Sequence, residues 1–304
     1  MNFKNKKLNI LITGASGMLG LSLASSLMDK HNIFGTGSSD LNNVNFNYLK
    51  FDLLNQSYNE LIKWCKPDLI IHCAAITDAD YCENNPWDAL NVNGFSVKKL
   101  IDSTKDYVKI IFISTDAVFN DRTHMANESD LTSPENIYGK SKELAEFFLQ
   151  NSNREFLILR TTIVGLNEFT QRKGFLEWII NSVKSKKAIS LFDDVLFTPI
   201  SIWDFIKEIN FIIENDLINS RVFHLSGSEA ITKYEFGLTL IKKLSLDTNY
   251  ILKGRLINNN FKAKRANNQT LDSLKYEKEF NRKLPNIRQT IISIINRYNY
   301  EIKY

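Results

Sequence analysis

Tyr138 and Lys142 are the residues whose types and spacing most directly suggest chemistry in this chain. Side chains four positions apart on a helix lie on one face, about one turn from each other. A tyrosine ordinarily titrates near pH ~10, and a neighbouring ammonium group is expected to lower that pKa. A phenol of lowered pKa is suited to protonating a carbonyl oxygen as it becomes an alkoxide. The spacing alone is common, and an ordinary surface helix turn is the competing interpretation.

Two other features strengthen the tyrosine–lysine pair as a signal. Ser114 and Thr115 follow the apolar run Val108–Ile113, which is typical of a buried strand. Near the N-terminus, the apolar run Leu8–Thr13 leads directly into a glycine-rich turn. An amphipathic helical pattern then continues to Lys30.

A strand, a glycine-rich turn and a helix in this order are typical of dinucleotide binding. Glycines allow the tight turn and a close backbone approach, and the helix N-terminus offers N–H groups to a pyrophosphate. The spacing here is GxxGxxG, which differs from the GxGxxG of the common dehydrogenases. The predicted cofactor-binding residues of the turn are Gly14, Ser16, Gly17, Met18, Leu19 and Gly20.

Strand and helix patterns alternate along the chain, which favours a parallel, doubly wound α/β sheet of the Rossmann type. A smaller, helix-rich C-terminal region carries no dinucleotide signal and is expected to bind the substrate. The predicted dinucleotide-binding domain comprises 1–165 and 196–226, and the predicted substrate domain comprises 166–195 and 227–304. Further strands are expected at 33–36, 48–51, 69–75, 156–161 and 222–225, with helices at 58–64, 87–104, 138–151 and 202–214.

The second expected strand ends in Gly37-Ser38-Ser39. It lacks the acidic residue that typically hydrogen-bonds the ribose 2′-hydroxyl of NAD at this point. Small residues such as Ser38 leave room for a 2′-phosphate, so we expect NADPH as cofactor, with NADH as the alternative. Asp52 and Leu53 are placed to hold an adenine edge, and Ala74 and Ala75 to form a cofactor-facing wall. His72, within the same apolar run as these alanines, is expected to be a packing residue.

Composition excludes several classes of protein. The 304 residues carry a formal net charge of +4 and have no long basic run, so nucleic acid is not an expected partner. The three cysteines form no CxxC, and we expect them to be reduced, with no metal site. No run approaches the ~18 apolar residues of a membrane span. Lys4, Lys6 and Lys7 precede a short apolar stretch that is better explained as a strand than as a signal peptide, so a cytoplasmic protein is expected.

With these motifs in order, the chain resembles the extended short-chain dehydrogenase/reductases, and within them the dTDP-4-dehydrorhamnose reductase branch. The resemblance covers nearly the whole chain. Its matching segments are 14–20, 74–80 with Glu83, 92–93, 114–119, 133–138, 160–161 and 265–271.

The resemblance implies the reduction of a keto group on a nucleotide-linked 4-keto-6-deoxysugar. Tyr138 would be the proton donor, Lys142 would lower its pKa and hold the cofactor ribose, and Thr115 would hydrogen-bond the substrate carbonyl. It also implies a homodimer formed through helices that flank the sheet. The implied substrate-binding residues are Thr77, Asp116, Val118, Arg160 and Arg265, with Arg172 as a further candidate for the diphosphate.

The chain departs from that branch at positions in its substrate half. Ile163 stands where a tryptophan is frequent, Thr162 replaces a serine, and Ala266 replaces a proline. The identity of the base and the sugar therefore stays open. A sugar-nucleotide dehydratase is disfavoured, because Ala117 stands beside Asp116 where that reaction needs an acid. A nucleotide-sugar epimerase, or an NADP-binding regulatory subunit without turnover, remains as the alternative.

Overall fold

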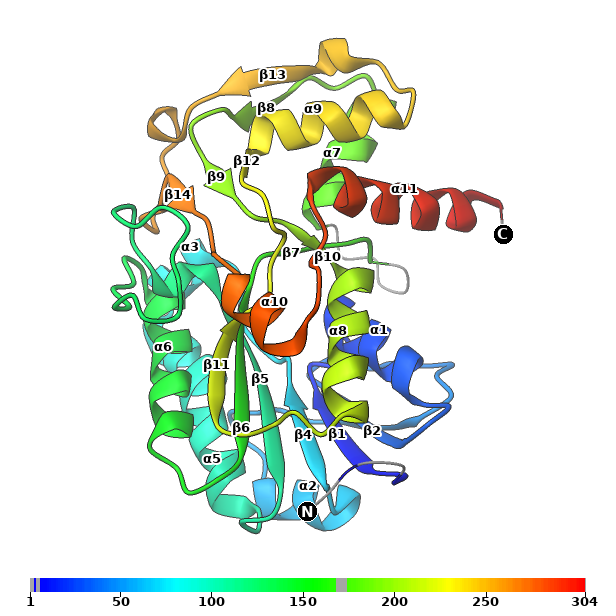
Figure 1. The fold of residues 1–304 in the computed structure, drawn as a ribbon, viewed down its shortest axis with the longest axis vertical. Coiled ribbons are helices and arrows are strands. Elements are labelled where there is room, and N and C mark those ends of the chain that lie inside the picture. Colours follow the sequence, from blue (N-terminus) through cyan, green and yellow to red (C-terminus); the bar gives the residue numbers. More distant parts are fainter. Residues whose placement is uncertain (1–2, 4–5, 168–173, 304) are drawn as a thin grey trace.

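The structure of the chain, a computed structural model, describes residue 3 and residues 6–167 and 174–303. Its centre is a seven-stranded parallel sheet in the order β11-β6-β5-β4-β1-β2-β3 (Figure 1). The strand order reverses its direction at β1, so the predicted doubly wound, Rossmann-type sheet is confirmed. The strands are β1 (Asn9–Thr13), β2 (Asn32–Gly37), β3 (Asn47–Lys50), β4 (Leu69–His72), β5 (Lys109–Thr115), β6 (Phe156–Thr161) and β11 (Arg221–His224).

Alternate side chains of the central strands enter two separate cores, one on each face of the sheet. In β5, Ile111 and Ile113 contribute to one core, whereas Ile110 and Phe112 contribute to the other. Burial on both faces is what a near-continuous apolar strand predicts. Helices α1 (Met18–Leu27) and α8 (Ile202–Glu214) cover the first face, and α2 (Tyr58–Cys65), α5 (Ser96–Ser103) and α6 (Ile137–Gln150) cover the second.

The segment expected to form one long helix at 87–104 is not a uniform α-helix. It consists of α4 (Pro86–Ala89), the π-helix η1 (Leu90–Phe95) and α5. Within η1, the buried Asn93 accepts the backbone N–H of Ile76 at 2.7 Å and donates to the Ile76 carbonyl at 3.0 Å. Asn93 also donates to the Ser141 hydroxyl of α6 at 2.9 Å. Such π-turns are frequent near functional sites, and this one fixes the segment after β4 against α6.

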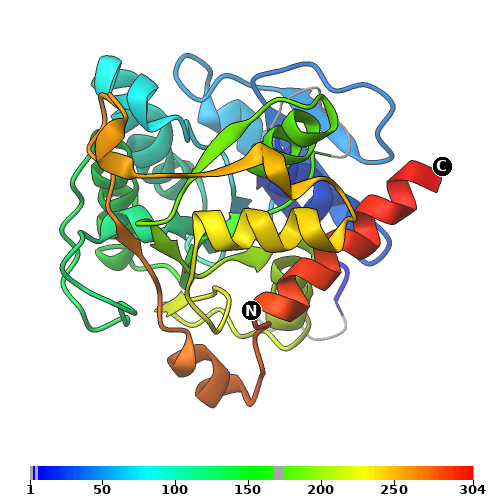
Figure 2. The same ribbon diagram turned by 90° about the horizontal axis from the view of Figure 1, so that it is seen from above.

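The C-terminal region lies above the carboxyl ends of the strands, and α11 packs against α9 and α8 as it runs outward to the C-terminus (Figures 1 and 2). It has its own apolar core, which includes Phe197, Phe236 and Ile294. Its elements are α7 (Phe175–Lys184), β8 (Ile189–Phe192), β9 (Leu196–Phe197), β12 (Ile231–Thr232), α9 (Lys233–Lys243), η3 (Thr248–Tyr250), β13 (Ile251–Gly254), η4 (Leu256–Asn258), β14 (Asn268–Gln269) and α11 (Ile287–Lys303).

Helix α10 (Leu274–Phe280) belongs to the C-terminal part of the sequence but packs on the core of the large sheet. Its buried Tyr276 donates a hydrogen bond to Glu208 of α8 at 2.9 Å and contacts the ring of Phe223 in β11. The domain limits proposed from the sequence remain a prediction. The remaining short elements are α3 (Ala79–Asn84), η2 (Asp116–Val118), β7 (Ile163–Val164) and β10 (Ile200–Ser201).

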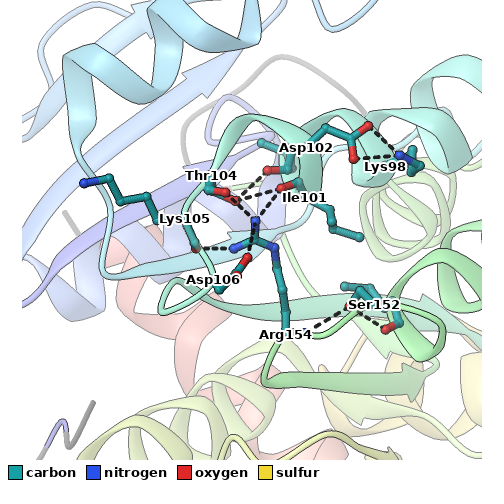
Figure 3. Close-up of polar contacts among 10 residues, drawn as sticks. Lys98, Ile101, Asp102, Thr104, Lys105, Asp106, Ser152 and Arg154 are labelled. Carbon is teal, nitrogen blue, oxygen red and sulfur yellow. Dashed lines mark hydrogen bonds and ion pairs between the residues drawn. The ribbon is translucent and has the colours of Figure 1, made fainter.

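At the amino edge of the sheet, Arg154 joins the start of β6 to the end of α5 (Figure 3). Its guanidinium group donates to the carbonyl oxygen of Ile101 at 2.5 Å and also to those of Thr104 and Lys105. Asp106 completes the cluster with an ion pair at 3.6 Å. Cations favour the carbonyls at a helix C-terminus, so Arg154 anchors α5 and, through α5, the π-helix.

Candidate active site

A cavity of about 810 Å³ opens at the carboxyl edge of the sheet, between the glycine-rich turn, the ends of the central strands and the beginning of α7. It brings together segments from the whole first half of the sequence. Many of the residues predicted from the sequence line it, namely Gly14, Ser16, Gly17, Met18, Leu19, Gly20, Ser38, Asp52, Leu53, Ala74, Ala75, Thr77, Thr115, Asp116, Tyr138 and Lys142.

The glycine-rich turn is pressed against the end of β4. Gly14 has a φ of +70°, and a Cβ atom at this position would lie 2.8 Å from the backbone of Ala74. A larger residue would therefore be excluded by both conformation and space. Helix α1 begins at Met18 with no acidic side chain in its first turn, so its free N–H groups face the cavity without a competing carboxylate.

Beside this turn, β2 ends against Ser16 and Tyr48. A Cβ atom on Gly37 would clash with both side chains, and the Tyr48 hydroxyl donates to the Ser39 carbonyl at 2.5 Å. Ser38 is exposed and lines the cavity. On β3, Lys50 pairs in register with Gly37 and forms a 2.7 Å ion pair with Asp40.

Tyr138 and Lys142 lie one turn apart on α6, and both line the cavity. Burial raises the pKa of the Tyr138 phenol, and the nearby Asp116 carboxylate raises it further, although the Thr115 hydroxyl opposes the rise. The expected lowering of this pKa is not found, because burial and the Asp116 carboxylate both raise it. The raised pKa keeps Tyr138 protonated at neutral pH, which is the state of a proton donor.

Lys142 is 2% exposed, and its ammonium group lies 4.1 Å from the centroid of the Phe112 ring. Burial lowers its pKa to about 7, against the opposing effects of Cys73 and Glu146. Among the described residues, no carboxylate oxygen lies within 4.0 Å of this ammonium group. Lys142 therefore presents hydrogen-bond donors to the cavity that no acidic side chain uses.

The hydroxyl groups at the end of β5 are already oriented by carboxylates. Ser114 donates to Glu146 at 2.5 Å, and Thr115 donates to Asp116 at 2.8 Å. Asp116 also accepts the hydroxyl of Thr162 at 2.8 Å. Burial raises the pKa of Asp116, and these two hydroxyl donors partly oppose that effect. For Thr115 to donate to a substrate carbonyl, its hydroxyl has to rotate away from Asp116.

Two further threonines supply unused polar groups to the cavity. The hydroxyls of Thr36, at the end of β2, and Thr161, at the end of β6, are buried and have no hydrogen-bond partner among the described residues. Buried hydroxyls normally find a partner. The sequence interpretation did not single out either threonine, because a threonine in a strand has no distinctive pattern.

Three residues with predicted substrate roles lie outside the described lining of the cavity. Val118 is fully buried in a small core with Ala126 and Leu271. Arg160 is buried below the site and donates to Glu146 at 2.6 Å and 3.0 Å. Arg265 forms an ion pair with Asp80 at 3.4 Å, and Arg172 lies outside the residues that the structure describes.

The buried Arg160–Glu146 pair supports the end of β5 from below. Glu146 binds the Ser114 hydroxyl as well as the Arg160 guanidinium, which also contacts His224 at 3.5 Å. The Nδ1 of His224 donates to the Ala126 carbonyl at 2.8 Å, because a carbonyl oxygen can only accept. This network holds Ser114 in place through groups that do not enter the cavity.

His72 is a packing residue, as predicted. Its ring lies between the hydroxyls of Thr13 at 2.8 Å and Ser96 at 3.0 Å, and burial lowers its pKa to about 3. Ser96 donates its own proton to the Val92 carbonyl at 2.7 Å, so the ring must donate from Nε2 and accept at Nδ1. The neutral ring thereby ties β1 and β4 to the start of α5, where Ser96 in turn bonds Val92 of the π-helix.

Cys65, Cys73 and Cys82 are free thiols in the structure. Within the described ranges, no group of three or more histidine, cysteine or acidic residues is arranged to hold a metal ion. None of the helices in the described part of the chain is long and apolar enough to cross a membrane.

With this geometry in view, the chain can be compared with known proteins. It is 27% identical over 289 residues to the probable low-salt glycan biosynthesis reductase Agl14 of Haloferax volcanii, covering 93% of this chain and 96% of that protein. It is also 25% identical over 288 residues to methionine adenosyltransferase 2 subunit beta of Mus musculus, covering 88% and 81% of the two chains.

A similar fold is found in the crystal structure of dTDP-4-dehydrorhamnose reductase from Bacillus anthracis in complex with NADP. The TM-score is 0.85 at 23% identity, and the match covers 96% of this chain and 100% of that chain. The model of the RmlD substrate binding domain family matches residues 8–300. These matches confirm the resemblance that the sequence motifs indicated, and the chain belongs to the RmlD substrate binding domain family.

Proposed function

We propose that this protein uses NADPH to reduce the keto group of a nucleotide-linked 4-keto-6-deoxysugar in the synthesis of a deoxysugar or surface-polysaccharide precursor. The observation that carries this proposal is the position of Tyr138 and Lys142 in one cavity with the glycine-rich turn. The names of relatives in the same family, a glycan biosynthesis reductase and a dTDP-4-dehydrorhamnose reductase, support it.

The residues of the cavity fit a bound dinucleotide. The close approach of Gly14 to Ala74 leaves room for a pyrophosphate at the N-terminus of α1, where free N–H groups would bind it. The donors of Lys142 would hold the hydroxyls of the nicotinamide ribose, and the hydroxyls of Thr36 and Thr161 have no other partner in the described part of the chain. Ala74, Ala75, Asp52 and Leu53 remain the proposed walls of the cofactor site.

In this mechanism the bound cofactor supplies the hydride. Tyr138, which stays protonated at neutral pH, gives its proton to the carbonyl oxygen as negative charge develops there. The Thr115 hydroxyl turns from Asp116 toward the same oxygen and stabilises it. A charged Lys142 next to the cofactor would then favour the tyrosinate that proton transfer leaves behind.

Cofactor preference is part of the proposal. The end of β2 has a small, exposed Ser38 and no acidic residue in contact with the cavity there, which suits a 2′-phosphate. We propose NADPH as the preferred cofactor and NADH as a weaker one. Titration of the protein with NADPH and with NADH, followed by nicotinamide fluorescence, tests this preference. Much tighter binding of NADH would overturn the proposed preference for NADPH.

A regulatory subunit that binds NADP without turnover is the second candidate, favoured by the similarity to methionine adenosyltransferase 2 subunit beta. The complete set of Thr115, Tyr138 and Lys142 supports the enzyme instead. Incubation with NADPH and a panel of nucleotide-linked 4-keto-6-deoxysugars separates the two. Oxidation of NADPH supports the reductase, and conversion of a sugar without net oxidation indicates an epimerase. Tight binding of NADPH without any conversion indicates the regulatory subunit.

We further propose that two copies of the chain associate through the exposed side of α4, η1 and α6, and that the protein acts in the cytoplasm. Trp87, Phe95 and Phe147 are exposed there. The centroid of the Phe148 ring lies 5.4 Å from that of Phe95 and 6.0 Å from that of Phe147. Exposed aromatic side chains gathered on neighbouring helices in this way are typical of an interface. Sedimentation analysis of the wild type and of Trp87→Asp tests it, and a monomeric wild type would contradict it.

A further inference from the structure

Asn136 begins the helix that carries Tyr138, the proposed proton donor. Its side-chain oxygen accepts the backbone N–H of Gly139 at 2.8 Å, and its backbone carbonyl accepts the N–H of Lys140 at 3.0 Å. Tyr138 therefore lies inside the first turn that this N-cap closes. A Cβ atom on Gly139 would collide with the Ala117 carbonyl, so the same turn of α6 packs directly on η2. These contacts fix the backbone around Tyr138.

The other end of the Asn136 amide reaches the C-terminal region. Its Nδ2 donates to the backbone carbonyl of Lys264, 128 positions later in the sequence, at 2.8 Å. The two partners define the orientation of the amide, because an N–H group can only donate and a carbonyl can only accept. Asn136 is 9% exposed, so both bonds are shielded from water. One buried side chain thus joins the turn that holds Tyr138 to the segment before β14.

Helix α3 contacts both segments that Asn136 joins. Asp80 accepts the backbone N–H of Ala263 at 2.9 Å, and Glu83 accepts that of Ile137, the first residue of α6, at 2.7 Å. Helix α3 begins two residues after the cavity-lining residues 73–77. The wall of the cavity, the turn that holds Tyr138 and the C-terminal region are therefore connected here by hydrogen bonds from side chains to backbone.

We propose that Asn136 is a positioning residue, whose bond to Lys264 sets the position of Tyr138 relative to a substrate held by the C-terminal region. This inference rests on the proposed function, because it takes Tyr138 as the proton donor. The competing interpretation is an ordinary N-cap, a role in which Asn, Asp and Ser are about equally good. Among these three, only the amide of asparagine accepts from Gly139 and also donates to Lys264, so substitutions separate the two roles.

Asn136→Asp keeps the size of the side chain and the capping oxygen but turns a carboxylate oxygen toward the Lys264 carbonyl. A misplacement of about 1 Å can lower a rate ~100-fold, so we expect kcat with a keto sugar at pH 8 to fall ~10- to 100-fold. NADPH affinity should stay within about threefold. A carboxylate is at least as good a cap as the amide, so a residue that only capped α6 would leave kcat unchanged. An unchanged kcat would overturn the proposal.

The pH dependence of this variant distinguishes a bridge from a cap. A protonated carboxyl has an O–H group that can donate to the Lys264 carbonyl, as the amide does. Burial beside a carbonyl should raise the pKa of the new carboxyl above its usual ~3.9. The deficit in kcat, relative to wild type at the same pH, should therefore shrink between pH 8 and pH 5.5. A cap alone predicts the reverse, because protonation removes the charge that a helix N-terminus favours. A constant or growing deficit would overturn the proposal.

A second variant and two controls complete the test. Asn136→Ser keeps a capping oxygen, but its hydroxyl is too short to reach Lys264, so it should lose as much kcat at pH 8 and recover none at pH 5.5. Thr232→Ala removes the side-chain cap of α9, and Lys262→Met removes a contact between the same C-terminal segment and Asn84 of α3. Both controls should turn over like wild type. If Asn136→Asp does not fold, Asn136→Ser decides, and wild-type kcat in that variant would overturn the proposal.

Hydrogen exchange tests the bridge without turnover. The N–H of Ala263 is bonded to Asp80, and loss of the neighbouring Asn136 bond should let residues 260–267 exchange up to about tenfold faster in Asn136→Asp than in wild type at pH 8. Thr232→Ala should not change this segment. Unchanged exchange in Asn136→Asp would overturn the bridge. If exchange changes as expected while wild type turns over no keto sugar, the reductase proposal fails and the bridge stands.

Discussion

The two ends of strand β5 each have a buried lysine, and the surroundings of these lysines are opposite in kind. Lys109, at the amino end, is 4% exposed and pairs with Asp216 at 2.8 Å and with Glu155 at 2.9 Å. Burial alone would lower its pKa, but the two carboxylates outweigh burial and raise it. Lys142, near the carboxyl end, is 2% exposed and has no such partner in the described chain, so burial lowers its pKa to about 7.

The same contrast extends to the rest of each edge. At the amino edge, Arg154 is enclosed by helix-end carbonyls (Figure 3). At the carboxyl edge, the buried hydroxyls of Thr36 and Thr161 have no hydrogen-bond partner, and the Lys142 ammonium no carboxylate in contact, among the residues that the structure describes. Charged and polar groups at the amino edge thus stabilise the fold, whereas those at the carboxyl edge retain binding capacity for ligands. Four predictions test this division.

The largest effect is expected for Tyr138→Phe. Removal of a positioned general acid typically lowers the rate ~10²- to 10⁴-fold, and the phenylalanine keeps the size of the ring, so NADPH affinity should stay within about threefold. Turnover of a keto sugar and fluorescence titration of NADPH measure the two quantities. Tyr107→Phe is the control, because Tyr107 is 51% exposed and lies outside the described lining of the cavity. A Tyr138→Phe variant with wild-type turnover would exclude the proton-donor role.

Next in size is the loss of stability in Lys109→Met. Removal of this lysine leaves Asp216 without its cation, and breaking a buried ion pair from one side costs ~3–5 kcal/mol. Glu155 is about half exposed and adds less to this cost. Urea unfolding monitored by circular dichroism gives the change in free energy of unfolding. A loss below about 1 kcal/mol would show that the amino-edge pair does not stabilise the fold.

Lys142→Met is the matching change at the other end of the strand. When no cofactor is bound, it should increase the free energy of unfolding, whereas Lys109→Met should decrease it. The pKa of Lys142 is about 7 in the folded chain and ~10.4 in the unfolded chain, so the unfolded state holds more protons between these values. The penalty for burying the ammonium is complete below pH 7 and disappears as pH rises toward 10. Wild type should therefore gain stability, by up to about 1.4 kcal/mol per pH unit, relative to the variant.

Urea unfolding of both chains at several pH values between 7 and 10 measures this difference. The variant should be the more stable protein at pH 7, and the gap should close at higher pH. A variant that is less stable than wild type at pH 7 would place Lys142 with Lys109 among the structural lysines. The same variant should lose affinity for NADPH, because the proposed ribose contact is gone.

The smallest effect is expected for Ser38→Asp at the end of β2. A carboxylate at this exposed position should repel a 2′-phosphate by about 1 kcal/mol, which corresponds to ~5-fold weaker binding of NADPH. NADH binding should not weaken, because its 2′-hydroxyl can donate to the new carboxylate. Parallel titrations with the two cofactors measure the ratio of affinities. An unchanged ratio would place the 2′-phosphate elsewhere.

The sequence predicted the sheet well because each central strand is buried on both faces. A continuous apolar run such as Ile110–Ile113 then has only one stable environment, between two layers of helices. The π-helix at Leu90–Phe95 could not be predicted in this way. Its cause is tertiary, since Asn93 must reach the backbone of Ile76 and the hydroxyl of Ser141. Neither partner is near Asn93 in the sequence.

The glycine-rich turn and the tyrosine–lysine pair were predictable because local geometry fixes their roles. The effect of their surroundings on their pKa values could not be predicted. The pKa of Tyr138 is raised and not lowered, since burial depends on all the elements that enclose the phenol.

The central claim is that the carboxyl edge of the sheet reduces a keto sugar, and NADPH consumption tests it most directly. Purified protein is mixed with NADPH and nucleotide-linked 4-keto-6-deoxysugars that differ in base and sugar. The account predicts oxidation of NADPH with at least one of them, a reduced sugar of matching amount, and loss of both signals in Tyr138→Phe. Tight binding of NADPH with no oxidation across the whole panel would contradict the reductase.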